Sequence, residues 1–499
     1  MNRALTRVSL VCLIMFVLLL LNVNYLQAFR ATSLADEPGN ARVFNEQFTY
    51  QRGAILAAGD GTDLKIAESR LIKGTNLYQR YYPYGGIYAP VTGYDSIYGK
   101  TGIEQAENSL LAGTSPALAV HNFTSLLTGK QQQGATVELT ISPAAQTAAY
   151  RAIASQSGGR SVGLVALNPA TGAILALVSS PTFNPNQLTT LNGAQLNKND
   201  ERLLRNPTQP LLNRATQVTM PPGSTFKIVT SSAAFSTGKV ANPNTTIPAP
   251  TVLNLPNGQP LHNDANSACA NGQPPIIEAF YLSCDTAFGD LGMKVTAPVL
   301  REYATRFGMN QPLSIPLPVV PSVLPEGPGW TDRSLTAYTA IGQYNDAVTP
   351  LQVAMFAATI ADHGTLMRPY LVQRILGPGL SVISAHAPTV FSRPDSPRVA
   401  AYVQQMMAQV TANPSGTAYA TAGRQATGGI VIDAKTGTAQ TGVNSNGPAD
   451  AVFSCFVPGS NGNPSPIAVG VMVQGGGYGS VGAAPLAVAV IKAFLAAHP

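Results

Sequence analysis

Charged residues are scarce in this sequence of 499 residues. Lys, Arg, Asp and Glu make up 11% of the chain, well below the usual quarter, and the net charge is only +6. No stretch combines a basic run with interleaved aromatic residues, which is the pattern of nucleic-acid-binding proteins. The composition therefore gives no support for a nucleic-acid partner, while the length leaves room for several domains.

Cysteine and histidine are also rare, and their positions exclude the common metal sites. The four cysteines form no C-x-x-C pair and no Cys/His cluster with zinc-ligand spacing, and the five histidines are scattered. In an oxidising compartment Cys269 and Cys284, which lie 15 residues apart, would form a disulfide. The alternative is that both are small buried apolar residues.

A long uncharged segment lies near the start of the chain. Arg3 and Arg7 precede 22 uncharged residues from Val8 to Phe29. As a helix this segment would span roughly 33 Å, about the hydrocarbon thickness of a bilayer. The arginines favour a cytoplasmic N-terminus and place everything after Arg30 outside. A cleaved secretory signal is the alternative, but "NYLQAFRA" lacks a small-x-small cleavage site, so we expect a membrane anchor with an exported body.

The remainder has the pattern of an α+β protein. "ATVELTI" alternates like a strand, "SPAAQTAAYRAIAS" is typical of a helix with a capping serine, and "SVGLVAL" and "AILALVSS" predict a β-hairpin around "NPATG". Near the end, "GIVIDAKTGTAQ", "AVFSCFV" and "PIAVGVMVQ" predict three strands before a final helix. This order predicts a sheet assembled from segments that are distant in the chain.

The segment "STFKIVTSSAAFSTG" predicts a helix, from Ser224 to Gly238, that carries a serine and a lysine on one face. Positions i and i+3 of a helix are neighbours, so the ammonium group of Lys227 would lie within reach of the Ser224 hydroxyl. A serine attacks only if a group removes its proton, and a lysine in apolar surroundings can be that base. A Ser-x-x-Lys spacing also arises by chance about once in a chain of this size, as a helix cap beside a solvated lysine. A Ser–His–Asp arrangement fits poorly, because Ser224 is not in a G-x-S-x-G turn.

Two later segments support the pair. "IIEAFYLSCDTAFGDLG" places Ser283 at the end of an apolar helix, and "GIVIDAKTGTAQ" places a lysine, two threonines and a glycine on a strand. The lysine and hydroxyls would bind a substrate carboxylate, and the glycine would let an extended substrate come close. The backbone N–H groups of Ser224 and Thr438 would form an oxyanion hole. The strand candidates are Lys435, Thr436, Gly437 and Thr438.

A second K-T-G triplet, at residues 100–102, precedes Ser224 in the chain. It is followed by a helical pattern rather than by a strand. A three-letter match is weak evidence, and we expect a structural turn that leads into a helix.

In their order along the chain, Ser-x-x-Lys, Ser-x-Asp and Lys-Thr-Gly resemble the three motifs of penicillin-binding proteins. The segments "NRATQVTMPPGSTFK", "AIGQYNDAVTPLQVAMFAATIADHGTLMRPYLV" and "AKTGTAQTG" are similar to family segments, so the likeness covers residues 135–499. "YQRGAIL" and "GIEQAENSLLAG" extend it more weakly toward the N-terminus. There is too little chain before the hairpin for a glycosyltransferase domain, which indicates the monofunctional class B type, most like its actinobacterial PbpA kind.

The resemblance implies a penicillin-binding transpeptidase fold, in which a sheet is flanked by helices and joined to an all-helical subdomain. We expect a cytoplasmic stub and single transmembrane anchor in residues 1–30, and a membrane-proximal domain of the pedestal or dimerisation kind in 31–135. The transpeptidase domain would then be residues 136–499. The protein would sit in the plasma membrane with its catalytic domain outside the cytoplasm.

The resemblance also implies a mechanism and partners. The substrate would be a peptidoglycan stem peptide ending in D-Ala-D-Ala. Ser224 would attack the penultimate carbonyl with Lys227 as base, release D-alanine, and pass the acyl group to an amine of a neighbouring stem. Ser283 would carry a proton to the leaving amine, while Lys435, Thr436 and Thr438 would hold the terminal carboxylate. β-Lactams would acylate Ser224, no metal or cofactor is needed, and partner proteins of cell-wall assembly or division are expected without a motif that identifies them.

One residue departs from the family's pattern. The second motif normally ends in asparagine, and here the third position is Asp285. An ionised aspartate between two lysines would favour their charged forms and weaken Lys227 as a base. Three interpretations remain: Asp285 is protonated, it shares the proton transfer, or it points elsewhere.

Two other functions remain as alternatives. A D,D-carboxypeptidase or a β-lactamase would hydrolyse the acyl-enzyme, but such enzymes usually lack this membrane-proximal segment. A non-catalytic penicillin-binding scaffold would keep the fold without turnover, and Asp285 is the feature that keeps this alternative open.

Overall fold

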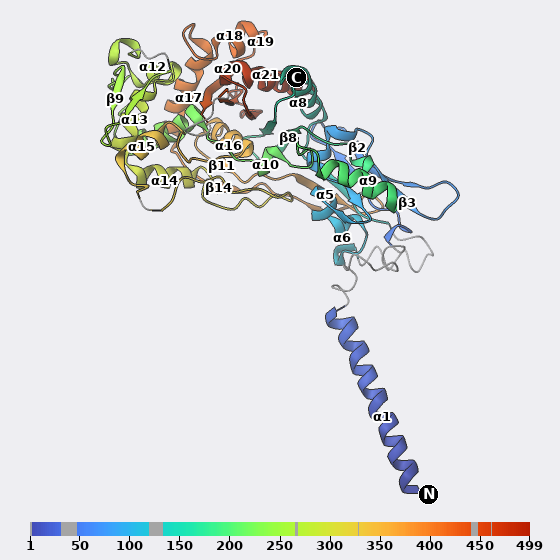
Figure 1. The fold of residues 1–499 in the computed structure, drawn as a ribbon. Helices are drawn as coiled ribbons and strands as arrows, with labels where there is room; N and C mark the ends of the chain where they lie inside the picture. Colours follow the sequence, from blue (N-terminus) through green and yellow to red (C-terminus); the bar gives the residue numbers. More distant parts are fainter. Residues whose placement is uncertain are drawn as a thin grey trace.

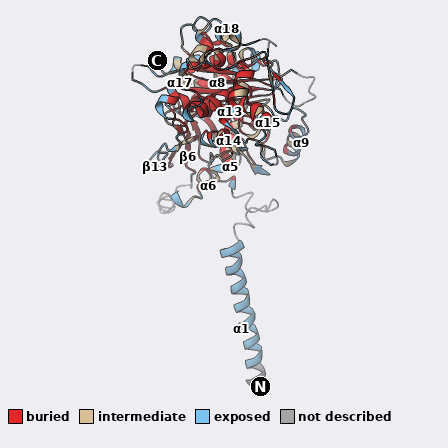
Figure 2. Cartoon of the chain, turned by 90° about the vertical axis from the view of Figure 1, so that its left-hand side faces the viewer, coloured by how far each residue is buried: buried red, intermediate tan, exposed pale blue. Residues whose placement is uncertain are grey.

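The computed structural model describes residues 2–30, 47–118, 133–264, 268–327, 329–440, 448–460 and 462–499. Helix α1 (Asn2–Tyr25) continues into a short π-helix at Leu26–Arg30, and Figure 1 shows it standing apart from the rest of the chain. The stretch Thr6–Arg30 has a mean hydropathy of 2.3 and is exposed along its length, so it is long and apolar enough to cross a membrane. In Figure 2 it is pale blue, while buried residues concentrate in the large body above it.

The sheet nearer to α1 takes its strands from both ends of the sequence. Its order is β13-β12-β6-β1-β2-β3, and β1 and β6 are parallel while the other pairs are antiparallel. The predicted boundary between residues 135 and 136 falls at the start of β6, so this sheet joins strands from both predicted domains. The strands are β1 (Ile55–Ala57), β2 (Leu64–Leu71), β3 (Tyr78–Tyr81), β6 (Thr136–Leu139), β12 (Val372–Leu376) and β13 (Val382–Ala385).

A second, antiparallel sheet forms the centre of the large body, with the order β15-β16-β17-β7-β8. Its hairpin β7–β8 turns through Gly172, whose φ of +81° suits glycine. The three late strands were predicted, and they make β15 an edge strand with one neighbour, β16. The strands are β7 (Val162–Leu167), β8 (Ile174–Ser180), β15 (Asp433–Ala439), β16 (Asp450–Phe456) and β17 (Ala468–Val473).

Helices cover both faces of this sheet. Helix α8 (Pro143–Gln156), whose first turn is capped by the Ser142 hydroxyl, packs with α21 (Ala484–Ala497) on one face. Helices α10 (Arg214–Gln217) and α16 (Pro350–Ala361) pack on the other. All twelve residues of α16 are buried, which explains its uninterrupted apolar sequence.

Six other helices form much of a largely helical region beside the sheet, at the left of Figure 1. They are α11 (Lys227–Ser236), α12 (Ile276–Tyr281), α13 (Asp285–Val295), α14 (Ala297–Arg306), α15 (Arg333–Ala340) and α17 (Pro397–Ala412). The N-terminal part carries α5 (Gly102–Ala106) and α6 (Asn108–Leu111), and α9 (Gly193–Leu204) packs beside it. The architecture is thus the predicted one of a sheet flanked by helices. The subdomain, expected to be all-helical, also holds a hairpin of β9 (Val252–Asn254) and β10 (Pro260–His262), which packs on α13.

Candidate active site

Ser224 lies in a tight turn that is packed against the edge strand β15. The predicted helix begins as a 3-10 turn, Gly223–Phe226, and continues as α11. Gly223 has a φ of +52° and donates its amide to the Gly342 carbonyl at 2.9 Å. A Cβ on Gly223 would lie only 2.8 Å from the Thr438 carbonyl oxygen, so the glycine lets the serine turn approach β15.

Lys227 is fully buried at the start of α11, and its ammonium group is turned toward the second motif. Its Nζ donates to the Ser283 carbonyl at 2.8 Å and lies 3.3 Å from the Ser283 hydroxyl. It also pairs with Oδ1 of Asp285 at 2.7 Å. The ring of Phe288 lies 5.4 Å from the same nitrogen, so an apolar wall faces the ion pair.

The second motif is a strained connection between two helices. Ser283, which follows α12, has a φ of +64°, a conformation that costs a non-glycine residue of the order of 1 kcal/mol. The next residue, Cys284, is buried and joined by a disulfide to Cys269, and Asp285 begins α13. The helix end, the disulfide and the first turn of α13 therefore hold Ser283 in its strained position.

Lys435 approaches Ser283 from the other side. Its Nζ donates to the Ser283 hydroxyl at 2.9 Å and to the Thr436 carbonyl at 3.1 Å, and the ring of Phe280 lies 5.5 Å away. Burial, followed by the nearby charge of Lys227, holds the pKa of Lys435 well below its usual value. The Ser283 hydroxyl thus bridges two buried lysines.

The N–H of Thr438 points to the open edge of the sheet. Its carbonyl accepts a hydrogen bond at 3.1 Å from the side chain of Gln343, which lies outside the sheet. In an antiparallel strand the N–H and C=O of one residue point to the same side. Since β15 has a neighbour on one side only, the Thr438 N–H faces the Ser224 turn, where an oxyanion hole was expected.

Two strand residues, Gly437 and Thr436, have close partners within the protein. A Cβ on Gly437 would lie 2.7 Å from the Pro222 carbonyl oxygen and 3.2 Å from the Thr225 side chain. The space that this glycine leaves is therefore filled by the serine turn rather than left for a substrate. The hydroxyl of Thr436 is hydrogen-bonded to that of Thr417 at 2.8 Å.

Sequence reasoning missed several residues that contact the motifs. Gln343 lies in the quoted family segment "AIGQYNDAV", and that resemblance was the only signal for it. Thr417 comes from a segment without a motif. Phe280 and Phe288 lie within the quoted segment "IIEAFYLSCDTAFGDLG", but nothing in the sequence marked them as contacts of the two lysines. Asp264 interacts electrostatically with Asp285 and with both lysines. Its pKa is raised, first by burial and then by the charge of Asp285.

The second K-T-G triplet lies away from this cluster. Lys100 ends the short strand β5 (Gly99–Lys100) and pairs with Asp95 at 3.3 Å, and α5 begins at Gly102. The triplet therefore occupies a turn that leads into a helix in the N-terminal part.

Comparison with known proteins gives a consistent answer over the whole chain. Residues 162–492 match the penicillin binding protein transpeptidase domain. The chain belongs to the penicillin-binding protein family. Residues 52–137 match the penicillin binding protein A dimerisation domain, and these two matches leave the division at residues 135 and 136 a prediction.

Relatives of this penicillin-binding protein cover it almost end to end. It is 38% identical to the peptidoglycan D,D-transpeptidase PbpA of Mycolicibacterium smegmatis over 509 residues, 99% of each chain. It is also 38% identical to the PbpA of Mycobacterium tuberculosis over 513 residues, 100% of each chain. The structure of penicillin-binding protein A from M. tuberculosis as its penicillin G acyl-enzyme complex has a TM-score of 0.81 and 36% identity, and covers 89% of this chain and 100% of that chain. The predicted family and fold class are confirmed.

Proposed function

We propose that this chain is a peptidoglycan D,D-transpeptidase that works through a serine acyl-enzyme at Ser224. The observation that carries the proposal is the convergence of the three motifs on one hydroxyl. Nζ of Lys227 and Nζ of Lys435 lie 3.3 Å and 2.9 Å from Oγ of Ser283. The membership of a transpeptidase family and the penicillin G acyl-enzyme of a 36% identical relative support the same reaction.

Acylation would follow from this geometry. The Ser224 oxygen attacks the penultimate carbonyl of a D-Ala-D-Ala stem, and its proton moves to Lys227 when that amine is neutral. The oxyanion is stabilised by the N–H groups of Ser224 and Thr438. The C–N bond then breaks, and the proton passes through Ser283 to the leaving D-alanine. The amine of a second stem repeats these steps in reverse, forming the new amide and returning a proton to Ser224.

The terminal carboxylate of the donor would be held by Lys435, Thr436 and Thr438. The depressed pKa of Lys435 makes its neutral form accessible in the empty site. A substrate carboxylate beside it favours the ammonium form, so binding and charging of Lys435 are coupled. Asp285 takes part through its contact with Lys227, and Gly437 acts by letting β15 meet the serine turn.

The membrane helix gives the proposed location. We infer that α1 anchors the protein in the plasma membrane as a single span, with Arg3 and Arg7 on the cytoplasmic side. The remaining domains would then reach peptidoglycan outside the membrane. Partner proteins of cell-wall assembly or division would bind this exported part.

Intact-mass measurement of the full chain in detergent, after incubation with penicillin G, tests the nucleophile. We expect a mass increase of one penicillin that is absent in Ser224→Ala and retained in Ser236→Ala, an exposed serine at the end of the same helix. Lys435→Ala should lose the adduct, while Lys100→Ala, in the other K-T-G triplet, should keep it. A penicillin adduct that survives in Ser224→Ala would contradict the assignment of the nucleophile. Rapid decay of the adduct in the unaltered chain would indicate a hydrolase.

A further inference from the structure

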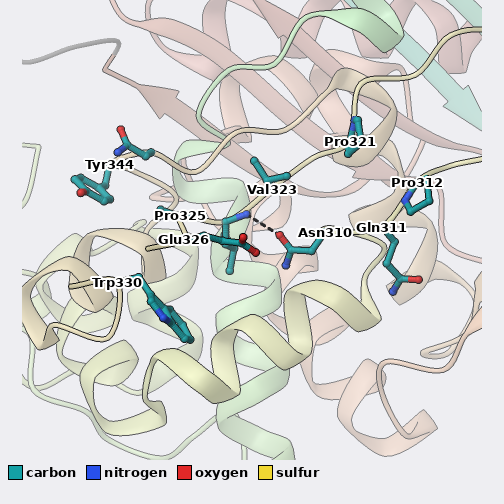
Figure 3. Close-up of a pocket in the computed structure, with 11 residues that line it drawn as sticks. Asn310, Gln311, Pro312, Pro321, Val323, Pro325, Glu326, Trp330 and Tyr344 are labelled. Atoms are coloured by element: carbon teal, nitrogen blue, oxygen red, sulfur yellow. Dashed lines mark hydrogen bonds between the residues drawn. The ribbon is translucent and has the colours of Figure 1, made fainter. Parts of the chain in front are cut away.

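A cavity of about 510 Å³ lies in the helical region, outside the cluster around Ser224. Its lining includes two aromatic residues, three amides and one carboxylate. In Figure 3, Trp330 and Tyr344 lie at one end and Gln311 and Pro312 at the other, with Glu326 between them. The volume lies in the range of sites for small ligands.

The negative charge in the cavity lining is balanced by a neighbouring arginine. Glu326 is its only charged residue, and Arg301 pairs with it at 2.8 Å while stacking on Trp330 at 4.5 Å. Gln311 uses its amide nitrogen on the Thr305 carbonyl, which leaves its oxygen as an acceptor, and Asn345 is exposed. A neutral cavity with aromatic surface and planar amides suits a polyhydroxylated ring, whose C–H face packs on aromatic rings and whose hydroxyls bind amides.

Backbone hydrogen bonds link the cavity wall to the catalytic serine. Val323 in the wall exchanges two hydrogen bonds with Ala347, at 2.8 Å and 3.0 Å. Val348 exchanges two more with Met220, at 2.9 Å and 3.0 Å, and Met220 lies four residues before Ser224. The segment 342–348, which we call the bridging loop, is therefore paired with the cavity wall and with the serine segment.

The other end of the bridging loop contacts the proposed oxyanion hole. The carbonyl of Gly342 accepts the amide of Gly223, and the side chain of Gln343 spans the Thr438 carbonyl at 3.1 Å and the Gln440 amide at 3.4 Å. The next residue, Tyr344, lines the cavity. Neighbouring residues of one loop thus touch the ligand cavity and the catalytic backbone.

The bridging loop also holds two unfavourable features. Tyr344 has a φ of +70°, and the carboxyl group of Asp346 is buried beside the Thr339 side chain. Burial raises the pKa of Asp346 well above its usual value, because the charged form is disfavoured away from solvent. Strained residues of this kind cluster at switch regions, where surrounding contacts hold them in place.

We propose that this cavity binds a saccharide unit of the glycan strand, and that its occupancy repositions the bridging loop and changes the rate of acylation at Ser224. The ligand class rests on the proposed function, since a peptidoglycan transpeptidase meets N-acetylated sugar rings beside every stem peptide. The site would let the enzyme respond to the presence of polymeric glycan.

The tryptophan fluorescence of the protein tests binding directly, because Trp330 is its only tryptophan. We expect the β-1,4-linked disaccharide of N-acetylglucosamine to change the emission saturably in the full chain. Asn345→Ala should weaken the affinity at least tenfold, whereas Asn244→Ala, an exposed asparagine outside the cavity lining, should not. Ser224→Ala should bind the sugar normally, so failure of the proposed nucleophile and failure of this site are distinguishable.

The coupling is tested by the acylation rate with a fluorescent penicillin. A saturating concentration of the disaccharide should change this rate at least twofold, and Asn345→Ala should abolish the effect at the same concentration. No saturable change in Trp330 emission would overturn the site. Saturable binding with an unchanged acylation rate would overturn the coupling.

Discussion

Oδ1 of Asp285 lies 2.7 Å from Nζ of Lys227, so the residue that departs from the family's pattern touches the proposed base. An ionised carboxylate at this distance favours the ammonium form, which cannot accept the proton of Ser224. Of the three interpretations of Asp285, that it points elsewhere is wrong. Lys227 accepts the Ser224 proton only as the neutral amine, so the charge of Asp285 opposes its proposed role as a base.

Replacing Asp285 by asparagine separates the effect of its charge on Lys227 from the effect of its hydrogen bond to Lys227. Asp285→Asn keeps an oxygen for Lys227 but removes the negative charge, which favours the neutral amine at lower pH. We expect Asp285→Asn to be acylated about tenfold faster than the unaltered chain, because the neutral amine is the form that accepts the serine proton. Stopped-flow acylation by a fluorescent penicillin between pH 5 and 9 measures it.

Asp290→Asn is the matched control, because Asp290 lies on the same helix and pairs with the half-exposed Lys294. It should leave the profile unchanged. Loss of acylation by Asp285→Asn at every pH would instead show that the carboxyl group itself takes the proton.

Local patterns predicted most elements that carry the site. The alternation in β6, the turn between β7 and β8 and the capping serine of α8 are properties of short segments, so single stretches of sequence reveal them. The return of β12 to pair with β6 is not such a property, because partners more than 200 residues apart leave no local pattern. For the same reason Gln343 and Thr417 were missed as contacts of β15.

The protein group that approaches Gly437 was not predictable for a related reason. The sequence indicated that a close approach is needed at this position, but not which group approaches. The structure gives the answer as the Pro222 carbonyl, because the serine turn and β15 are brought together only by the fold. The sequence therefore predicts that some group packs closely against a glycine, but not which group it is.

A methyl group at this position tests the contact between strand and turn. The Cβ of Gly437→Ala would lie 2.7 Å from the Pro222 oxygen and 3.0 Å from Cβ of Val452, and neither can move freely. We expect a loss of about 1–3 kcal/mol in stability and a fall of at least about tenfold in acylation rate, as the oxyanion N–H groups separate.

Thermal unfolding and penicillin acylation measure both effects. Gly379→Ala is the control, since a Cβ there meets no atom within 4 Å. Equal stability and equal acylation rates in the two variants would show that the strand and the serine turn can separate without cost.

A buried ion network in the N-terminal part makes a stability prediction. Glu104 is fully buried and accepts hydrogen bonds from Arg52 at 2.7 Å and Arg80 at 2.5 Å. Glu104→Gln would leave two nearly buried guanidinium groups without this counter-charge, which costs about 3–5 kcal/mol. Unfolding by urea, followed by circular dichroism, should show an earlier transition of this part.

The exposed ion pair of Glu68 with Arg70 offers a comparison for that buried network. Glu68→Gln removes the partner of Arg70, whose side chain is 54% exposed, and should change stability by less than about 1 kcal/mol. A Glu104→Gln protein as stable as Glu68→Gln would show that Asp95, the other acid beside Arg52, compensates fully.

The free energy of unfolding should also decrease as the pH rises from about 4 to about 6, because β15 contains a buried carboxyl group. Burial raises the pKa of Asp433 to about 6, although the Gln404 side chain donates a hydrogen bond to it at 3.1 Å. In the unfolded chain the same group loses its proton near pH 4. Between these values the unfolded state binds fewer protons, so the free energy of unfolding decreases as pH rises and is constant above about pH 6.

Asp433→Asn removes this cost, because the amide keeps an oxygen for Gln404 and has no charge to bury. We expect the variant to be more stable than the unaltered chain at pH 7, by at most about 3 kcal/mol, and equal to it near pH 4. Thermal unfolding across this pH range measures the difference, with Asp63→Asn as an exposed control that should show none. Since burial also raises the pKa of Asp395 to about 6, part of the decline should remain in the variant. A gain of the same size at pH 4 and pH 7 would contradict the titration, because it would come from packing rather than from charge.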